Sequence, residues 1–406
     1  MKVILFYILR IFFVKLELKG SPLIIEKRLI FRKTVLINRR DIVRVQTRRT
    51  LLLRLLHGKE VTIFTQNGKA VFYLSESEFP DFLPKSRNIG IKPRFPEILF
   101  GAFIDTRALA GIAVFAFTLR KIAKIFGGSY FDGIIRAIFT TAESLAKALE
   151  IAHIVFPKTA VFLAVFALLS WIFSFIRKIL SLSRFEMSRK NGSVYVKSGL
   201  ITLYENLLVP NTAAVISRKT LFSFVTKRAP IYFRDVMIFP CAGGKAREKI
   251  LRSFFDIKIR SQTPAKSPLR AVFGHCALPM WSFFGFSAAL LLLFITGNGS
   301  ALITRTLLTA GIIISAYLFG LFFLFMKNAE SSFSDDFLMI STRKGTALYS
   351  AFFPAGLASG TVFRQSVFQQ LSGLCSVSVK LYEHKTCTAR LIPFTSKLSL
   401  QLKILR

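Results

Sequence analysis

Four cysteines and four histidines are the side chains of this 406-residue chain best suited to metal or redox chemistry. The cysteines are Cys241, Cys276, Cys375 and Cys387, and no two of them form a C-x-x-C pair. His384 lies near Cys387 in sequence, but a closed zinc site needs four ligands at characteristic spacings. We therefore expect reduced, mostly buried thiols, no metal site and no bound cofactor.

A glycine pair followed by lysine, in "CAGGKAREK" at 241–249, suggests phosphate binding. A P-loop requires G-x-x-x-x-G-K-[ST], and here the first glycine is missing and Ala246 replaces the hydroxyl residue. We interpret the stretch as a turn that opens a helix. His153 and His275 lie beside apolar segments, so no Ser-His-Asp grouping can be assembled. We expect no catalytic residues and no enzymatic activity.

Positive charge dominates the electrostatics, because 57 Lys and Arg residues face 21 Asp and Glu residues and give a formal net charge of +36. Six arginines crowd around one predicted turn: Arg39, Arg40, Arg44, Arg48, Arg49 and Arg54. Beside a membrane, such a cluster attracts anionic lipid by about 1 kcal/mol per charge. Nucleic acid is the usual alternative, but aromatic residues do not interleave with these arginines. We expect binding to anionic lipid headgroups or an acidic partner protein, and no nucleic acid.

Four windows are apolar over the roughly 20 residues that a helix needs to cross a bilayer. They cover about 98–119, 159–180, 278–297 and 306–326, and the last two contain no charged residue. The first contains Asp105 and Arg107, which we interpret as a possible polar site inside the membrane. Alternatively, both charges lie near the membrane boundary and face water or a neighbouring helix.

Positive residues precede the first window and follow the second and fourth, whereas the "GNGSA" loop between the third and fourth is uncharged. Arg120, Lys121 and Lys124, which follow the first window, disagree with this pattern. By the positive-inside rule, the flanking segments should be cytoplasmic. The start of the chain has no small-residue cleavage pattern and is interpreted as a strand, with a short membrane-surface anchor as the alternative. The segment 129–156 has apolar residues at helical spacing. It is interpreted either as an interfacial helix on the outer face or as a helix packed against the spans.

Three water-facing segments are left, at about 1–97, 181–277 and 327–406, and they contain an internal repeat. Four positions of the third segment are Pro354, Ala358, Ser366 and Val377. The same intervals separate Asn38, Ile42, Thr50 and Val61. The middle segment shortens the earlier interval by two residues but preserves the last one, at Pro210, Ala214, Thr220 and Ile231.

Each copy has a predicted hairpin around its start: "SPLIIEKRLIFRKTVLI", "SVYVKSGLITLYENLLV" and "FLMISTRKGTALYSAFF". Helical spacing follows two copies, in "GKAREKILRSFF" and "SKLSLQLKIL", and the first copy has the shorter "SESEFPDFL". The unit is therefore several antiparallel strands followed by a helix, as in a small barrel or sandwich. The hydroxyl residues Thr50, Thr220 and Ser366 are interpreted as turn residues, with ligand contact as the alternative.

These copies resemble the bacterial pleckstrin-homology (PH)-like domains of multi-pass membrane proteins. In the third copy the matching residues are Pro354, Gln365, Ser366, Leu371 and Gly373. In the first copy they are Ile42, Thr50, Leu51, Leu52, Arg54, Leu55, Leu56 and Gly58. The middle copy keeps "VPNTAAV" and the preceding "SGL", while Ala214 and Ala358 stand where the family has Ile.

The resemblance implies PH-like barrels, a cell-membrane location, no catalytic residues and a role in envelope stress or antimicrobial-peptide tolerance. Similar three-domain proteins often begin with a further helix pair, which this sequence lacks. We thus predict a membrane α+β protein with PH-like domains at 1–97, 181–277 and 327–406, each ending in a helix. Transmembrane hairpins at 98–180 and 278–326 separate the domains.

The expected function is display of three cytoplasmic PH-like domains at the bacterial cell membrane, for protein assembly or anionic-lipid contact. An oligomer or a partner membrane protein is left open. The alternative is a transport component whose path is lined by the span with Asp105 and Arg107. Transporters place several polar residues near the midplane, and in this sequence only one of the four predicted spans contains such residues.

Overall fold

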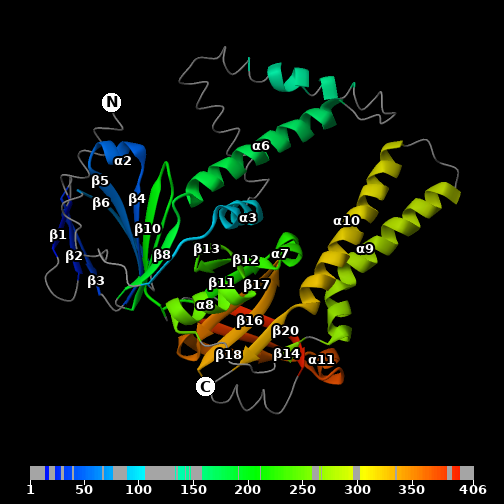
Figure 1. The fold of residues 1–406 in the computed structure, drawn as a ribbon. Helices are drawn as coiled ribbons and strands as arrows, with labels where there is room; N and C mark the ends of the chain where they lie inside the picture. Colours follow the sequence, from blue (N-terminus) through cyan, green and yellow to red (C-terminus); the bar gives the residue numbers. More distant parts are fainter. Residues whose placement is uncertain are drawn as a thin grey trace.

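The computed structural model describes most of the strands and long helices, and the account below concerns those residues. They are 14–17, 23–28, 32–38, 41–65, 68–75, 89–105, 133, 136–141, 143–145, 147, 158–190, 192–210, 212–257, 265–266, 268–295, 302–333, 336–381 and 386–393. Within these ranges the strands form two seven-stranded and two three-stranded sheets, and every strand pairing is antiparallel (Figure 1).

The first three-stranded sheet has the order β1-β2-β3, with β1 at Val14–Glu17, β2 at Leu23–Arg28 and β3 at Arg32–Ile37. The first seven-stranded sheet has the order β6-β5-β4-β10-β9-β8-β7. Its first three strands in sequence are β4 (Ile42–Arg49), β5 (Gly58–Thr65) and β6 (Lys69–Ser75). The others are β7 (Ile89–Ile91), β8 (Glu186–Lys190), β9 (Ser193–Ser198) and β10 (Leu203–Leu208).

The second seven-stranded sheet repeats this arrangement in the order β13-β12-β11-β17-β16-β15-β14. Its strands are β11 (Val215–Lys219), β12 (Arg228–Phe233), β13 (Val236–Gly243), β14 (Ala265–Lys266), β15 (Glu330–Phe333), β16 (Phe337–Lys344) and β17 (Ala347–Pro354). A 3-10 turn at Ala355–Leu357 leads to the last three-stranded sheet. That sheet contains β18 (Ala358–Arg364), β19 (Leu374–Leu381) and β20 (Thr386–Pro393).

The three predicted hairpins are confirmed as β2/β3, β9/β10 and β16/β17. Alternation explains β19, because Val377, Val379 and Leu381 are buried while Lys380 between them is exposed. The predicted helix "GKAREKILRSFF" is α8 (Gly244–Phe255). The other two predicted terminal helices, "SESEFPDFL" and "SKLSLQLKIL", lie outside the described residues apart from Ser75, which ends β6.

The sheets continue from one segment of the repeat into the next. β4 pairs with β10 along its length, and β11 pairs with β17 in the same way. These pairings join the three segments edge to edge, and they were not predicted. A buried hydrogen bond lies in the first joint, where the Thr47 hydroxyl donates to Glu205 at 3.3 Å. Ser217 and Ser350, both buried, are opposed at the corresponding position of the second joint.

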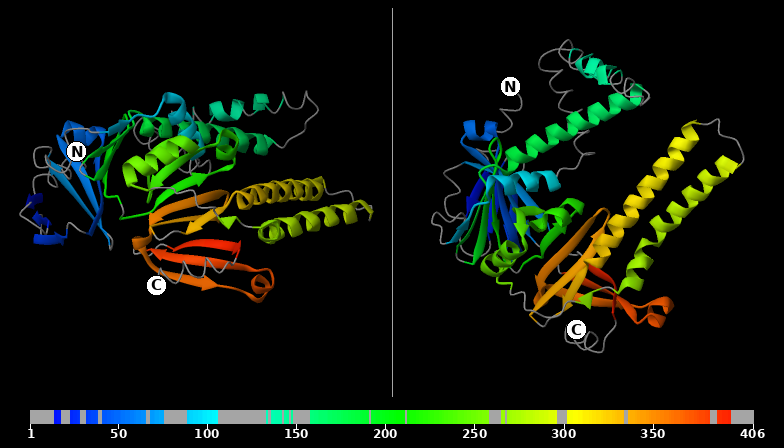
Figure 2. Two further views of the ribbon diagram at one scale, coloured as in Figure 1. Left: turned by 60° about the horizontal axis from the view of Figure 1, so that its bottom comes forward. Right: turned by 45° about the vertical axis from the view of Figure 1, so that its right-hand side comes forward.

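Among the described residues, three of the four hydrophobic cores lie between two successive sheets. The first core contains Ile37 from β3 together with Val45, Ile63 and Phe72 from the first seven-stranded sheet. The middle core joins β8–β10 to β11–β13, and α8 contributes Ile250, Leu251, Phe254 and Phe255. The third core joins β16 and β17 to β19. Sheets and these cores therefore alternate along the molecule, and Figure 2 shows the succession of the sheets.

Long apolar helices leave the sheets as α3 (Phe95–Asp105), α6 (Lys158–Leu182), α9 (Leu269–Ile295) and α10 (Leu302–Lys327). Among described residues, Val165–Leu182 in α6 and Cys276–Leu293 in α9 are long and apolar enough to cross a membrane. The apolar stretches Phe95–Ile104 in α3 and Gly311–Lys327 in α10 are shorter. Part of the predicted first span, 106–119, lies outside the described residues.

α9 and α10 form a hairpin that is held by small side chains. Gly311 on α10 lies under the Phe286 ring, since a Cβ atom there would be 3.0 Å from two ring carbons. The Ser282 hydroxyl donates to the Ser315 hydroxyl at 3.0 Å between the same helices. Small residues and interhelical hydrogen bonds of this kind let apolar helices pack closely. In the 129–156 segment, 136–141 is helical and Ile138 is buried, but the described residues do not place this helix relative to a membrane.

Glycines allow close contact between two helices and the sheets. Gly101 on α3 contacts β13 so closely that a Cβ atom would lie 2.5 Å from the carbonyl oxygen of Pro240. Gly199 turns β9 into β10 with a φ of +106°, and a Cβ atom there would lie 1.9 Å from the carbonyl oxygen of Thr202. Its amide donates to the Ser183 carbonyl at 2.7 Å, which docks the turn on the end of α6. This explains the "SGL" of the middle copy.

Candidate functional site

Three short helices occupy the same position in the three copies of the repeat. They are α2 (Leu51–Leu55), α7 (Leu221–Thr226) and α11 (Val367–Leu371). Each begins directly after the hydroxyl residue of its copy, which is Thr50, Thr220 or Ser366. We call these three elements the turn helices.

The hydroxyl residues hold the starts of the turn helices. Thr50 Oγ1 accepts a hydrogen bond from the Leu53 amide at 3.3 Å, as an N-cap residue does. Ser366 and Gln369 form a capping box, since Ser366 Oγ accepts from the Gln369 amide at 3.3 Å and the Ser366 amide donates to Gln369 Oε1 at 2.9 Å. Thr220 instead contacts the Ser223 hydroxyl at 3.2 Å. The interpretation as turn residues is confirmed for Thr50 and Ser366.

The turn helices also end alike, in a left-handed residue seven positions after the hydroxyl. These residues are His57, Lys227 and Gly373, with φ values of 47°, 54° and 63°. A left-handed residue commonly ends a helix because its amide can bond a carbonyl of the last turn. Gly58, which matched the family pattern, is the first residue of β5 and does not supply the left-handed position.

Each turn helix presents an exposed apolar pair at its first and fifth positions. The pairs are Leu51 with Leu55, Leu221 with Val225 and Val367 with Leu371. The later member of each pair is the more exposed, at 79% for Leu55, 76% for Val225 and 82% for Leu371. Residues four apart lie on one face of a helix, so each pair forms a small apolar surface. These pairs were not predicted as surface residues, although their constant distance from the hydroxyl is visible in the sequence.

α7 lies between the two groups of long helices (Figure 1). The Phe222 ring is 4.6 Å from Phe103 and 5.9 Å from Phe100, both on α3, measured between ring centroids. On its other side, the Phe224 ring is 5.4 Å from Phe325 on α10. This turn helix therefore marks where the long helices meet the sheets.

The other two turn helices lie at comparable places. Arg54 Nη2 donates to the Leu200 carbonyl at 3.3 Å, and the Leu200 amide donates to the Leu180 carbonyl of α6 at 3.0 Å. These bonds place α2 beside the end of α6. Figures 1 and 2 show α11 close to the end of α9 that leaves the sheets. The three apolar pairs therefore lie beside the ends of the long helices that meet the sheets.

The predicted arginine cluster is divided by the fold. Arg39 and Arg40 lie outside the described residues. Arg44 is buried, with its guanidinium carbon 3.7 Å from the centroid of the Phe64 ring. Burial lowers the pKa of Arg44 to about 10, and the nearby Asp235 partly opposes this shift. Arg44 therefore stays protonated at neutral pH, but it serves the packing of the two seven-stranded sheets.

The later arginines are more accessible. Arg48 is 3.8 Å from Glu60 and has 45% of its side chain exposed. Its counterparts two residues before the hydroxyl are Arg218 and Arg364, so a cation precedes each turn helix. Arg49 is half-buried at the end of β4. Of the predicted intramembrane pair, Asp105 ends α3, but its side chain and the whole of Arg107 lie outside the described residues.

A second basic group, which was not predicted, lies in the second seven-stranded sheet. Burial lowers the pKa of Lys219 on β11, and the positive charge of Arg247 on α8 lowers it further. Burial also lowers the pKa of Arg247, whose guanidinium lies over the Phe352 ring at 5.8 Å. Glu330 opposes both shifts. Nothing in the spacing of these residues indicates that the fold brings them together.

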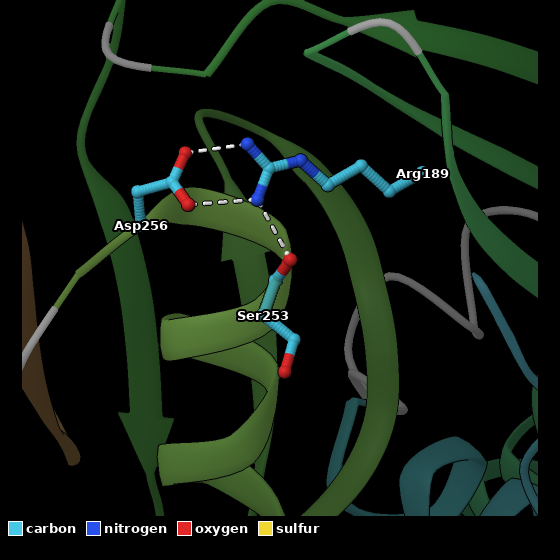
Figure 3. Close-up of polar contacts among 3 residues, drawn as sticks. All are labelled: Arg189, Ser253 and Asp256. Atoms are coloured by element: carbon cyan, nitrogen blue, oxygen red, sulfur yellow. Dashed lines mark hydrogen bonds and ion pairs between the residues drawn. The ribbon is translucent and has the colours of Figure 1, made fainter. Parts of the chain in front are cut away.

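Arg189 fixes the end of α8 to β8 (Figure 3). Its Nη1 atom donates to the Ser253 carbonyl and to Asp256 Oδ1, each at 2.8 Å, and its Nη2 atom bonds Asp256 Oδ2. A cation at a helix C-terminus is favourable because the last carbonyls carry partial negative charge. The hydrogen bond from Arg189 lowers the pKa of Asp256, so this pair stabilises the fold above the ordinary aspartate pKa and is lost in acid.

The cysteines and the glycine pair show no arrangement for catalysis among the described residues. Cys241, Cys276 and Cys375 are buried thiols that form no disulfide, and Cys387 is partly buried. No three His, Cys, Asp or Glu side chains of the described ranges lie together as metal ligands would. Gly243 is the N-cap of α8 and Gly244 its first residue, which confirms the predicted helix-opening turn.

Thiol reactivity is expected to follow burial. Burial raises the pKa of both Cys241 and Cys375 from 9.0 to about 11, so about one such thiol in a thousand is ionised at about pH 8. Iodoacetamide should therefore label Cys387 first, and mass spectrometry of peptides measures the order. Because the folded state retains these protons longer than the unfolded state, stability should fall as pH rises from 9.0 to about 11.

Equal labelling of all four cysteines in unfolded protein provides the control. Labelling of Cys241 or Cys375 as fast as Cys387 in the folded chain would contradict the burial of these thiols.

Comparison with protein families identifies the first strands. Residues 2–87 match the family model described as Bacterial PH domain, so a bacterial PH domain is found there. The match contains β1–β6 and α2 and covers 86 of the 406 residues. No characterised protein sequence and no solved structure matched the chain.

Proposed function

We propose that this chain is a non-enzymatic integral membrane protein in which the PH domain at residues 2–87 is the first of three PH-like domains. The domains lie at the cytoplasmic face of the bacterial cell membrane. The windows 98–119, 159–180, 278–297 and 306–326 anchor them as two hairpins. The turn helices contact the headgroup region of the inner leaflet, where anionic lipids bind the adjacent cations.

The main support for this proposal is that an exposed apolar pair recurs beside the ends of the long helices that meet the sheets. Burying a leucine side chain fully contributes about 1.5–3 kcal/mol, and insertion into the headgroup region gains part of that. The same pair occurs three times at one position of the repeat, which single exposed leucines on a soluble surface do not do. Three linked contacts also reinforce one another, because each raises the local concentration of the next.

Charge supports an anionic surface as the binding partner. Arg48, Arg218 and Arg364 stand at one repeat position beside the apolar pairs, and a cation near such a membrane contributes about 1 kcal/mol. The Arg48 contact with Glu60 at 3.8 Å is partly exposed. Exposed ion pairs of this kind are worth about 0–1 kcal/mol, so Arg48 can exchange its partner for a lipid phosphate.

A depth measurement on the full chain tests the proposal. A fluorophore is attached at Leu371→Cys in a Cys387→Ser background, and the protein is reconstituted into vesicles that contain brominated lipids. The expected result is strong quenching at position 371, which increases when anionic lipid replaces neutral lipid. Arg364→Gln should reduce that increase and leave quenching in neutral vesicles unchanged.

Lys380→Cys supplies the matched control, because Lys380 is exposed near the opposite end of β19, the strand that follows α11. Quenching at 371 no greater than at 380 would overturn the lipid contact of the turn helices. Quenching at 371 that is unaffected by lipid charge would overturn the role of the cations.

A further inference from the structure

Two strand edges end the row of sheets. Within the described residues, β18 is an edge strand of one three-stranded sheet and β3 is an edge strand of the other. The residues of β18 are exposed or half-buried, whereas most residues of its counterpart β4 are buried. Each terminal sheet has the strands of half a seven-stranded sheet: β1–β3 correspond to β8–β10 and β15–β17, and β18–β20 correspond to β4–β6 and β11–β13.

The two internal joints use one register. In the first joint, Arg48 of β4 stands opposite Tyr204 of β10. In the second, Arg218 of β11 stands opposite Tyr349 of β17. Both arginines precede the hydroxyl residue by two positions. A joint that recurs with the same register is a property of the repeat and does not depend on one pair of segments.

The packing beside the joints recurs as well. Leu207 of β10 packs against the first core, while Leu208 lies in the middle core. Phe352 of β17 lies in the middle core, while Phe353 lies in the third core. The last strand of each hairpin thus supplies one residue to the preceding core in the row and the next residue to the core of its own hairpin. Ile37 of β3 lies in its own core, so β3 occupies the same position as β10 and β17.

We propose that β18 of one copy of this chain pairs antiparallel with β3 of a second copy, through the joint that the chain already uses twice internally. The repeat fixes the register. Arg364, two residues before Ser366, stands opposite Lys33, four residues before Ile37, and Val362 stands opposite Val35. The two half-sheets then complete a further sheet of the internal kind. The inference concerns these strand edges and does not depend on lipid contact.

The partner strand comes from a second molecule because the two edges belong to sheets at different ends of the row, as Figures 1 and 2 show. Pairing of two different surfaces is head-to-tail. Such a contact yields a ring if the rotation between copies closes, and an open row of molecules if it does not. Unpaired strand edges are the usual place for sheet extension between chains.

The joint between copies is expected to be weaker than the internal joints. Arg364 would face Lys33 where the internal arginines face tyrosines, and like charges directly opposite are destabilising. Phe363 stands where Thr47 and Ser217 occupy the internal joints. The assembly is therefore reversible, and Lys33→Tyr, which restores the internal pairing, should strengthen it.

Disulfide cross-linking of the full chain in membranes tests the joint. Chains with Val35→Cys and chains with Val362→Cys, both in a Cys387→Ser background, are co-reconstituted and oxidised. Opposed residues of an antiparallel pair have Cα atoms about 4.5–5.5 Å apart, within the range that a disulfide spans. The expected product is a covalent dimer, and its yield should rise when Lys33→Tyr is added to the Val35→Cys chain.

The control replaces Val362→Cys with Thr361→Cys, which shifts the thiol to the other face of β18. We expect on the order of tenfold less dimer from this pair, because the Cβ atoms then point apart. Equal yields from the two pairs, or no dimer from Val35→Cys with Val362→Cys, would overturn the proposed joint. Membrane insertion and lipid quenching would be unaffected by that failure.

Discussion

Replacing Gly101 with alanine is expected to lower the stability of the folded chain by about 1–3 kcal/mol or more. The added Cβ atom would lie 2.5 Å from the carbonyl oxygen and 2.6 Å from the Cβ atom of Pro240. The carbonyl belongs to the β13 backbone, so it cannot rotate away as a flexible side chain would. α3 must therefore move off the sheet, and the Phe103 contacts with α7 move with it.

The apparent midpoint of thermal unfolding in detergent measures this effect, and Gly285→Ala is the matched control. Gly285 lies within α9, and a Cβ atom added there would have no neighbouring atom within 4 Å, so alanine should stabilise the helix by about 0.5–1 kcal/mol. The two Gly→Ala changes should thus have opposite signs. A midpoint for Gly101→Ala at or above that of the unchanged chain would contradict the close seating of α3 on β13.

Phe254→Ala is expected to have the larger effect, a loss of about 3–5 kcal/mol in the free energy of unfolding. Phe254 is completely buried, and it lies on α8 in the middle core with Phe233 and Phe239. That core joins strands of both seven-stranded sheets. A cavity there weakens the contact of α8 with two sheets at once, and the neighbouring atoms can fill it in part only.

Chemical unfolding of the purified full chain, followed by circular dichroism, gives the loss. Phe95→Ala removes the same number of atoms from a side chain that is 67% exposed, and it should change stability by about 0.5 kcal/mol or less. If both variants lost similar stability, α8 would not be an integral part of the middle core.

The sequence predicted the local structure of the repeat well, because that structure depends on short-range patterns. Alternating apolar residues specify β19, and turn residues specify the hairpins β9/β10 and β16/β17. α8 begins after a glycine pair, as expected from "GKAREKILRSFF". These features need no knowledge of what the next segment of the chain does.

The joints between segments could not be predicted in the same way. An edge strand and a central strand can have the same alternation, and the partner of β4 lies more than 150 residues away in β10. The burial of Arg44 follows from this joint, since its strand neighbour Leu208 belongs to the middle core. Within one segment, nothing in the sequence distinguishes Arg44 from Arg48, so both were predicted to belong to one arginine cluster.

The exposed apolar pairs of the turn helices could be predicted only in part. Leu51 and Leu55 matched the family pattern, and the spacing of Leu221 with Val225 and of Val367 with Leu371 is the same. Hydrophobic residues in a helix of five or six residues are commonly buried, however, and the sequence alone does not show which face is free. The structure exposes the pairs because each turn helix caps the end of a sheet and its middle residue, Leu53 in α2, faces inward.

The recurring register limits how the length of such a chain can change when its gene gains or loses coding sequence. Because Arg48 and Arg218 face equivalent tyrosines, β4 could meet β17 in the register in which it now meets β10. Excision of one whole unit with its helix pair would then leave a continuous row, and tandem duplication would lengthen it. Loss or duplication of only half a unit would leave a half-sheet without its complement, so gains and losses of strands should occur by whole units.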